Sequence, residues 1–201
     1  MTINFLRSIE TGRVQTNPTD WADKGEIISF YVVNSFFLVV LLVFPTFMLI
    51  KDSLESGING FGIAFATIPI ILGLYLLFSL FKWKQLTKID GVDIETNKEL
   101  IVPIVNGYYP ELTYEWDGDI LIGSRPWHHF SFKTGLNIVM IFKENQIYLN
   151  ILSINKGGPN PWMAYTNIGR AKEIGEILRD RIRHRPNDTQ QYVYDHGGVK
   201  D

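Results

Sequence analysis

The sequence predicts a membrane-inserted pair of α-helices joined to an α+β domain, in which about seven antiparallel strands are closed by one C-terminal amphipathic helix. Two apolar stretches, residues 27–50 and 61–81, contain no Asp, Glu, Lys, Arg or His. They supply 24 and 21 residues, and a helix needs about 20 to cross a bilayer. After residue 82, short apolar runs alternate with turn residues, and a helical repeat follows near the C-terminus.

A signal peptide and a soluble core helix fit the apolar stretches less well than membrane spans do. A signal peptide has an apolar region of about 7–15 residues after a short basic leader, and it ends at small residues. Here the leader is residues 1–26 with both charge signs, and the first stretch runs into Lys51 and Asp52. A core helix of a soluble protein keeps a polar face, and neither stretch has one.

The loop between the stretches, residues 51–60, is short, so the helices form a hairpin and both chain ends lie on one side of the membrane. Lys and Arg near the spans mark the cytoplasmic side. Lys51 is the one basic residue in the loop sequence, whereas the segments at the outer ends of the spans carry six: Arg7, Arg13, Lys24, Lys82, Lys84 and Lys88. We therefore expect a protein of the bacterial inner membrane with both termini in the cytoplasm.

Membrane-surface contacts are expected where the spans end. Trp and Tyr are enriched at membrane–water interfaces, and Trp21 and Trp83 flank the hairpin. Lys82, Lys84 and Lys88 follow the second span. Together with the arginines of the C-terminal helix, these lysines can hold the domain against anionic lipid headgroups. Alternatively, the arginines belong to a solvated helix end.

Residues inside the spans indicate contact between helices rather than a pore. Asn34 and the small residues Gly62, Ala66 and Gly73 allow two helices to approach closely. An ion pathway normally carries an ionisable group, and neither span has one. Two spans enclose no channel, so a pore would require a homo-oligomer formed through the spans.

The remainder divides into an N-terminal segment of residues 1–26, one soluble domain of residues 82–184, and a tail of residues 185–201 that we expect to be poorly ordered. Residues 82–201 contain 15 Lys and Arg and 15 Asp and Glu. This neutral balance lacks the electrostatic footprint of a nucleic-acid-binding domain. The chain has no Cys, which excludes disulfides and thiolate chemistry.

The soluble domain has the short-run pattern of an antiparallel sheet. Eight runs are candidate strands: Gln85–Ile89, Val92–Glu95, Leu100–Val105, Leu112–Trp116, Ile120–Gly123, His129–Lys133, Asn137–Phe142 and Ile147–Leu152. Asp117-Gly118 is a strong hairpin turn, and Glu144-Asn145 and Thr96-Asn97 are further candidates. A bent open sheet and a small closed barrel both fit this pattern.

A helix is predicted over residues 167–184. Its apolar residues recur every three or four positions and form one stripe: Ile168, Ala171, Ile174, Leu178 and Ile182. Thr166 or Asn167 can cap its start, and Pro186 stops it.

This order of elements resembles the membrane-anchored bacterial domains with a pleckstrin-homology-like fold, in which a seven-stranded bent sheet is capped by a C-terminal helix. Photosystem-assembly proteins with two N-terminal spans have a similar layout. The two-span β-barrel effectors of bacterial antiphage signalling are also similar, except for the closing helix. The resemblance covers residues 27 to about 184 through element order alone, and no functional residue is carried over.

Candidate chemical groups each have a structural as well as a functional interpretation. Glu111, Glu115, Asp117 and Asp119 suggest an acid–base pair or a cation site, or else the solvated edge of a hairpin. His128 is followed by a second histidine, but neighbours on a strand point to opposite faces. We therefore expect no metal and no cofactor.

The most unusual string, residues 124–129, combines Arg125, Trp127 and His128. Arg and Trp dominate interface energetics, so this string suits a recognition loop. Tyr108, Tyr109 and Trp162 are either further anchors or core residues.

We therefore expect a non-enzymatic scaffold that recruits a protein partner to the membrane. Three alternatives remain open: an immunity protein against a membrane-active toxin, an antiphage effector that oligomerises on nucleotide binding, and a membrane-bound hydrolase.

Overall fold

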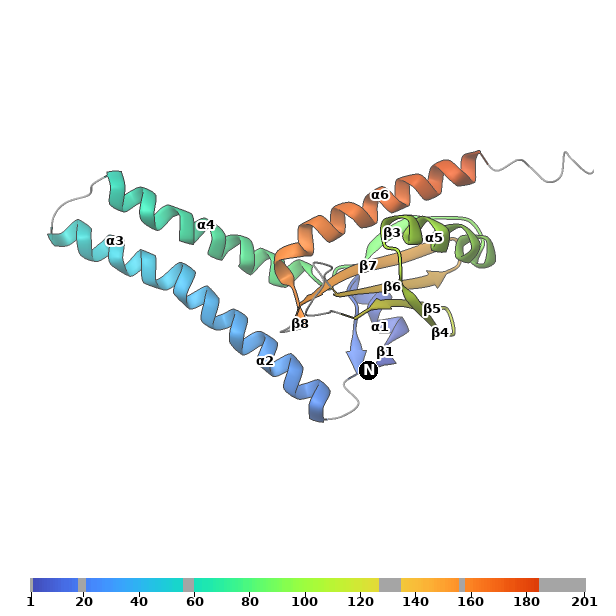
Figure 1. Ribbon diagram of the computed structural model, residues 1–201, viewed down its shortest axis with the longest axis horizontal. Coiled ribbons are helices and arrows are strands. Elements are labelled where there is room, and N and C mark those ends of the chain that lie inside the picture. The colour runs from blue at the N-terminus through green and yellow to red at the C-terminus, as the bar shows by residue number, and fades with distance from the viewer. Residues whose placement is uncertain (1, 18–20, 56–59, 127–134, 156–157, 185–201) are drawn as a thin grey trace, which may run out of the picture.

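The computed structural model describes residues 2–17, 21–55, 60–126, 135–155 and 158–184. A pair of long helices projects from a body made of a sheet and further helices, and the second helix of the pair runs directly into that body (Figure 1). We refer to these two parts as the helix pair and the body.

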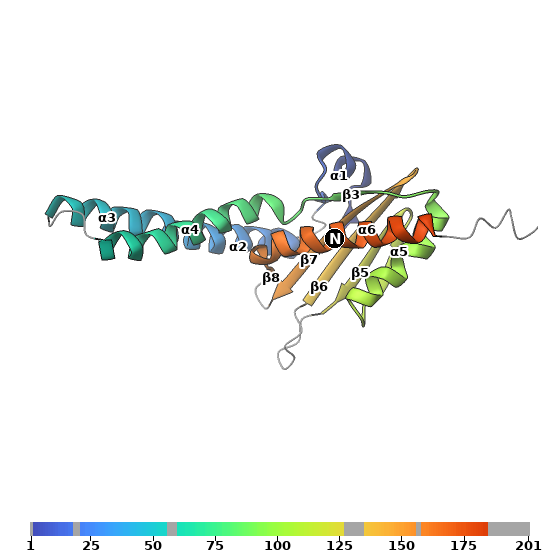
Figure 2. The ribbon, with the colours of Figure 1, turned by 90° about the horizontal axis from the view of Figure 1, so that it is seen from above.

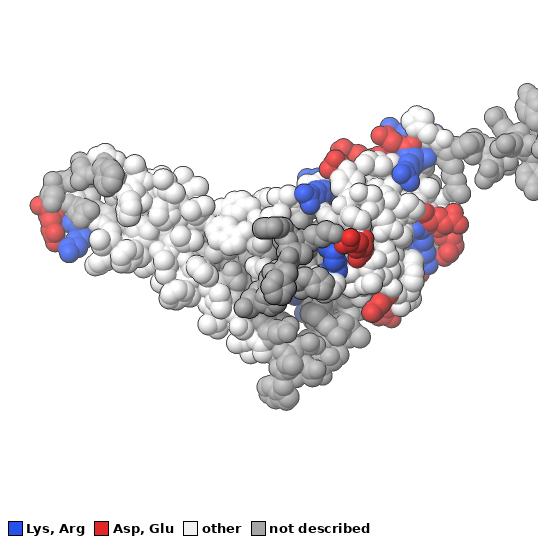
Figure 3. Space-filling model, in the orientation of Figure 1, with Lys and Arg blue, Asp and Glu red and all other residues white. Residues whose placement is uncertain are grey.

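The helix pair consists of α2 (Trp21–Leu38), the π-helical segment η1 (Val39–Val43) and α3 (Phe44–Glu55) on one side, and α4 (Gly60–Lys82) on the other. Only 11% of the most apolar part of the first helix and 22% of that of the second are buried within the chain. Charged atoms appear at the far tip and on the body, with none on the shaft between them in Figure 3. The structure confirms two helices that are long and apolar enough to cross a membrane.

The π-helical segment lies directly before Pro45. Proline lacks a backbone N–H, and its ring clashes with the carbonyl of residue i−4. The chain widens by one residue here, so that the Phe44 N–H donates to the Val39 carbonyl. The hydroxyl of Thr46 donates to the Leu42 carbonyl at 2.6 Å, so this carbonyl gains a side-chain donor.

The two helices lie close together at Gly73 of α4. A Cβ placed on Gly73 would lie 2.5 Å from Leu42 Cδ2 and 3.1 Å from Leu41 Cβ. Nearer the body, the Asn34 amide donates to the Phe30 carbonyl of its own helix at 2.7 Å. Asn34 and Ala66 are buried, and Gly62 is half-buried.

The body contains an antiparallel sheet in the order β3-β7-β6-β5-β4. Its strands are β3 (Thr87–Asp90), β4 (Thr113–Asp117), β5 (Ile120–Arg125), β6 (Gly135–Lys143) and β7 (Gln146–Asn155), and the short β8 (Gly158–Pro159) pairs with the end of β7. Both predicted hairpins are confirmed, with Gly118 at φ +60° and Glu144 at φ +52°. The first turn lies one residue later than predicted, at Gly118 and Asp119, because Asp117 still pairs with Ile120.

The prediction of seven strands is wrong for the described residues, since five strands form the main path of the sheet. The runs at 92–95 and 100–105 fall largely in helix α5 (Ile94–Tyr108), and Thr96-Asn97 lies in its first turn rather than in a hairpin turn. The Asp93 side chain caps this helix by accepting from the Thr96 N–H at 2.9 Å. The buried residues Ile101, Ile104 and Val105 follow helical spacing.

The sheet is open rather than barrel-shaped, because β3 and β4 lie at opposite ends of the strand order and do not pair with each other within the described ranges. The candidate strand at 129–133 lies outside the described residues.

Helices α5 and α6 (Ala164–Arg183) cover one face of the sheet (Figure 2). The core on that face includes Ile138, Met140 and Phe142 of β6, packed with Ile174 and Leu178 of α6. All five are fully buried.

The opposite face is covered by the N-terminal residues, an arrangement that the sequence pattern does not predict. Strand β1 (Thr2–Ile3), helix α1 (Phe5–Thr11) and strand β2 (Thr16–Asn17) form a small unit. Val14 packs on Leu86, Val139 and Ile141. The sheet therefore has a covered core on both sides, which explains the nearly continuous apolar sequence of β6.

The closing helix begins earlier than predicted. A short 3-10 turn, η2 (Pro161–Met163), leads directly into α6, and the Asn160 side chain caps this turn by accepting from the Trp162 N–H at 3.2 Å. Neither Thr166 nor Asn167 caps the helix, because both lie within it. The predicted tail, residues 185–201, lies outside the described residues.

We predict that Gly91→Ala lowers the free energy of unfolding by about 2 kcal/mol. A Cβ at Gly91 would lie 2.2 Å from Asn97 Oδ1. The fully buried Asn97 amide bonds both the N–H and the carbonyl of Val92, so displacing it leaves buried polar groups unpaired.

The matched control is Gly107→Ala in α5, where an added Cβ meets nothing within 4 Å. We expect it to raise stability by up to about 1 kcal/mol, the difference between Gly and Ala in a helix. Denaturant unfolding of the purified chain in mild detergent measures both variants. Equal stability of the two would contradict the proposed role of Asn97.

Candidate functional site

The connection from the helix pair to the sheet is four residues long, 83–86, and it is hydrogen-bonded on two sides. The Asn150 amide of β7 donates to the carbonyls of Trp83 and Gln85, at 3.1 and 2.9 Å. From the N-terminal unit, the Val14 N–H donates to the Lys84 carbonyl, and the Leu86 N–H donates to the Gly12 carbonyl, both at 2.8 Å. The exit of α4 is therefore fixed to both β7 and the N-terminal unit.

Aromatic contacts reinforce this connection. Trp83 is buried against Phe30 of α2, with ring centroids 4.9 Å apart. Tyr75 of α4 stacks on Trp162 at 5.8 Å, and its hydroxyl donates to the Trp162 carbonyl at 2.8 Å. Tyr165 of α6 lies 5.5 Å from the same Tyr75 ring. The start of α6 thus rests on the last turns of α4.

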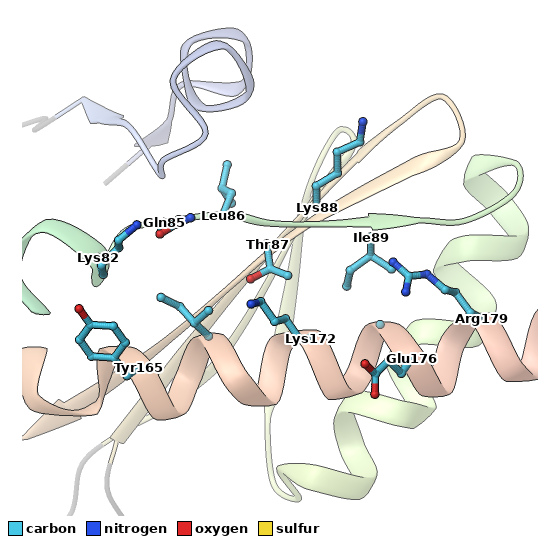
Figure 4. Close-up of a pocket in the computed structure, with 12 residues that line it drawn as sticks. Lys82, Gln85, Leu86, Thr87, Lys88, Ile89, Tyr165, Lys172, Glu176 and Arg179 are labelled. Atoms are coloured by element: carbon cyan, nitrogen blue, oxygen red, sulfur yellow. The ribbon is translucent and has the colours of Figure 1, made fainter.

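A groove of about 570 Å³ lies between α6 on one side and, on the other, the edge strand β3 and the residues that precede this strand. Its lining is Lys82, Gln85, Leu86, Thr87, Lys88, Ile89, Tyr165, Ile168, Lys172, Gly175, Glu176 and Arg179. In Figure 4, Thr87 and Ile89 point from β3 toward α6, Lys172 reaches from α6 toward Thr87, and the Tyr165 hydroxyl points toward Lys82. Small-molecule sites commonly have volumes in this range.

The groove carries an excess of positive charge. Its lining has four cationic side chains, Lys82, Lys88, Lys172 and Arg179, and one carboxylate, Glu176. Figure 4 shows the Lys88 amine and the Glu176 carboxylate directed away from the space between β3 and α6. Among the described residues, Lys82 and Lys172 have no carboxylate within 4.0 Å.

The far end of the groove is partly neutralised. The Arg179 guanidinium lies 3.9 Å from the Asp90 carboxylate, and both side chains are exposed. An exposed pair of this kind contributes about 0–1 kcal/mol. A glycine brings α6 close to β3 here, since a Cβ on Gly175 would lie 3.0 Å from Ile89 Cγ1. The remaining cations are therefore Lys82, at the end near α4, and Lys172, further along α6 beside Thr87 (Figure 4).

Lys84 lies beside the groove rather than in it. Its amine sits 4.9 Å from the centre of the Trp83 ring. Burial, and then the charge of Arg13, lowers the pKa of Lys84 below its ordinary value. A lysine whose pKa is lowered by folding is less destabilising once it is neutral, so its contribution to stability improves as pH rises toward 10.5.

The predicted partner-binding residues divide into two places. Arg125 ends β5 and donates to the carbonyl of Pro110 at 3.3 Å, the residue that follows Tyr108 and Tyr109 in the chain. Tyr109 is buried beneath the Arg170 guanidinium, 5.7 Å from its ring centre. The hydrogen bond between Tyr108 and Glu173 raises the pKa of Tyr108.

Trp162 belongs to the second place, the contact with Tyr75, and 37% of its surface is exposed. Trp127 and His128 lie outside the described residues. Of the membrane-surface tryptophans, Trp83 packs inside the protein, and the side chain of Trp21 lies outside the described part.

The acidic cluster has the features of a solvated hairpin. Glu115 in the middle of β4 and Asp117 and Asp119 beside the β4–β5 turn are all exposed, and Asp119 lies 3.6 Å from the Lys98 amine. In the described part of the chain, no three His, Asp or Glu residues are grouped so as to hold a metal ion.

Sequence reasoning does not assign the groove residues Tyr165, Lys172 and Thr87. A signal is present, since 165, 168, 172, 175 and 179 follow the helical repeat beside the apolar stripe. The pairing of this side of α6 with β3 is a tertiary arrangement that the repeat alone does not specify.

Comparison of the chain with protein-family models, curated proteins and solved structures gave no match.

Asn150→Ala is expected to lower the free energy of unfolding by about 2–3 kcal/mol, because it leaves two carbonyls without their buried donor and removes packing. Asn106→Ala is the control, since Asn106 is exposed and bonds the Tyr114 hydroxyl at the surface; its effect should be within about 0.5 kcal/mol. Denaturant unfolding in detergent compares them, and equal losses would show that Asn150 does not fix the connection.

Proposed function

We propose that this protein is anchored in the bacterial inner membrane by its helix pair and holds a binding domain at the cytoplasmic surface. The carrying observation is the exposed surface of the helix pair, which has no charged residue within 27–50 and 61–81, together with its fixed connection to the body. The exposed side chains include Phe36, Val40, Phe47, Phe65 and Ile68, each more than 40% exposed. Water disfavours an apolar surface of this size, and lipid accepts it.

The arrangement of the chain ends supports insertion as a hairpin. Residues 2–17 and the segment from 83 onward pack on each other, so both ends of the helix pair belong to one body. Arg13, Lys82 and Lys84 lie at the body end, whereas Lys51 lies at the tip. The excess of basic residues at the body end favours a cytoplasmic location for the body.

The body has a surface suited to a protein partner at the end of the sheet where Arg125 lies. This end adjoins β4, which is an edge strand of the sheet. Toward the other end of the same strand, beside the β4–β5 turn, Trp116 is 52% exposed and has the Lys98 amine 5.2 Å from its ring centre. Arg and Trp are the side chains that interfaces use most for affinity. We infer that a protein partner binds here and is thereby recruited to the membrane. In this proposal the protein does not act on its partner as an enzyme.

Cysteine accessibility tests the topology, because the chain has no Cys of its own. Ser53→Cys lies near the tip of the helix pair, and Lys143→Cys lies on the body. In intact cells with a permeabilised outer membrane, an impermeant maleimide should label the first variant and not the second, and lysis should expose both. Labelling of only the body variant would show that the orientation is the reverse of the one proposed. A chain that stays dispersed in detergent-free buffer would exclude membrane insertion.

Affinity purification in mild detergent tests recruitment. We expect a protein retained by the wild-type chain to be lost with the double variant Arg125→Ala, Trp127→Ala, because large anchor side chains commonly contribute about 2 kcal/mol or more, about 30-fold in affinity. The control is Lys143→Gln, at an exposed position on the β6–β7 turn. Unchanged retention by a folded double variant would remove this surface from the proposal.

A further inference from the structure

The groove begins at the level where α4 would leave the bilayer, an inference that rests on the proposed membrane insertion. Lys82 is the last residue of α4 and lines the groove. Tyr165, also in the lining, contacts Tyr75, which lies seven residues earlier on α4, or about 10 Å along the helix axis. The near end of the groove therefore opens toward the headgroup layer.

The donors along the groove suit a phosphate-bearing headgroup. Lys82 and Lys172 supply ammonium groups without a neighbouring carboxylate in the described residues. Hydroxyls of Tyr165 and Thr87 add neutral donors beside them (Figure 4). Charge-assisted hydrogen bonds from lysine are a standard means of binding phosphate.

An apolar surface continues from the groove along α4. Tyr75, Phe78 and Lys82 are spaced by three and four residues, so they share one face of the helix. Phe78 is 55% exposed. A phosphate bound at Lys82 thus has an apolar side chain below it on the side that would face the acyl chains. A soluble phosphate compound has no acyl chains to pack against this apolar surface, whereas a phospholipid has.

We propose that the groove between β3 and α6 binds the phosphate-bearing headgroup of an anionic phospholipid, with Lys82 and Lys172 as its cationic contacts. The bound lipid links α6 to α4 on the open side of the body. It places the body at a fixed height and rotation on the membrane surface.

Native mass spectrometry of the full chain in mild detergent tests this assignment. The probes are dihexanoyl phosphatidylglycerol, dihexanoyl phosphatidylcholine and inorganic phosphate. We expect retention of phosphatidylglycerol over phosphatidylcholine. The double variant Lys82→Gln, Lys172→Gln should weaken that retention about 30-fold, since each cation near an anionic lipid contributes about fivefold. Tyr165→Phe should weaken it less.

The control variant Lys143→Gln, Arg181→Gln removes the same charge from exposed positions outside the groove lining. It should bind as the wild type does. Equal retention of both lipids, or equal weakening by the control, would overturn the headgroup assignment. Displacement of the lipid by an equal concentration of inorganic phosphate would assign the groove to a soluble anion instead. A chain that needs no detergent to stay dispersed would reject the membrane proposal, which is a separate outcome.

Discussion

The passage from an apolar helix into a sheet within four residues is the constraint on which the rest of the structure depends. Backbone carbonyls in a connection between a helix and a strand have no donor from either element and need other partners, and a buried carbonyl without a partner costs about 1–3 kcal/mol. Asn150 supplies two of the missing bonds from β7, and the N-terminal unit supplies another to Lys84. Any movement of the body against α4 therefore breaks several buried hydrogen bonds at once.

The same strand connects this joint to the groove. Strand β7 pairs with β3 along one side, and its Ser153 bonds Asn167 of α6 at 3.2–3.3 Å. The separation of β3 and α6, which sets the width of the groove, is thus held by the strand that fixes the exit of α4. Contacts of Tyr75 with Trp162 and Tyr165 act at the near end. The groove and the end of α4 are therefore held by the same set of contacts.

The sequence predicts those parts whose signals are local. Hairpins at Asp117-Gly118 and Glu144-Asn145 follow from turn chemistry, and the closing helix follows from the spacing of Ile174 and Leu178. The pattern wrongly predicts strands where helix α5 forms, because the polar residues 96–99 separate two short apolar runs and resemble a turn. The signal for the helix is the Asp93 cap followed by apolar residues at helical spacing.

The remaining features depend on contacts between distant segments. Residues 2–17 carry few apolar side chains, and only the uncovered face of the sheet explains why they fold there. Asn150 looks like an ordinary strand residue until the carbonyls of Trp83 and Gln85 are placed beside it. The groove could be predicted only if β3 were already known to be an edge strand that lies beside α6. In each case the residues are visible in the sequence, but their contact partners are known only from the tertiary fold.

The widened turn at 39–43 has a consequence for the angular phase of the first helix. One residue of an α-helix corresponds to a rotation of about 100°, so the extra residue turns α2 by that amount about its axis relative to α3. With it, Phe30 faces Trp83 while Leu42 still faces Gly73. Deleting a single residue from the segment would remove the π-helical turn and rotate Phe30 away from Trp83. The extra residue at 39–43 therefore allows the first helix to make both contacts at once.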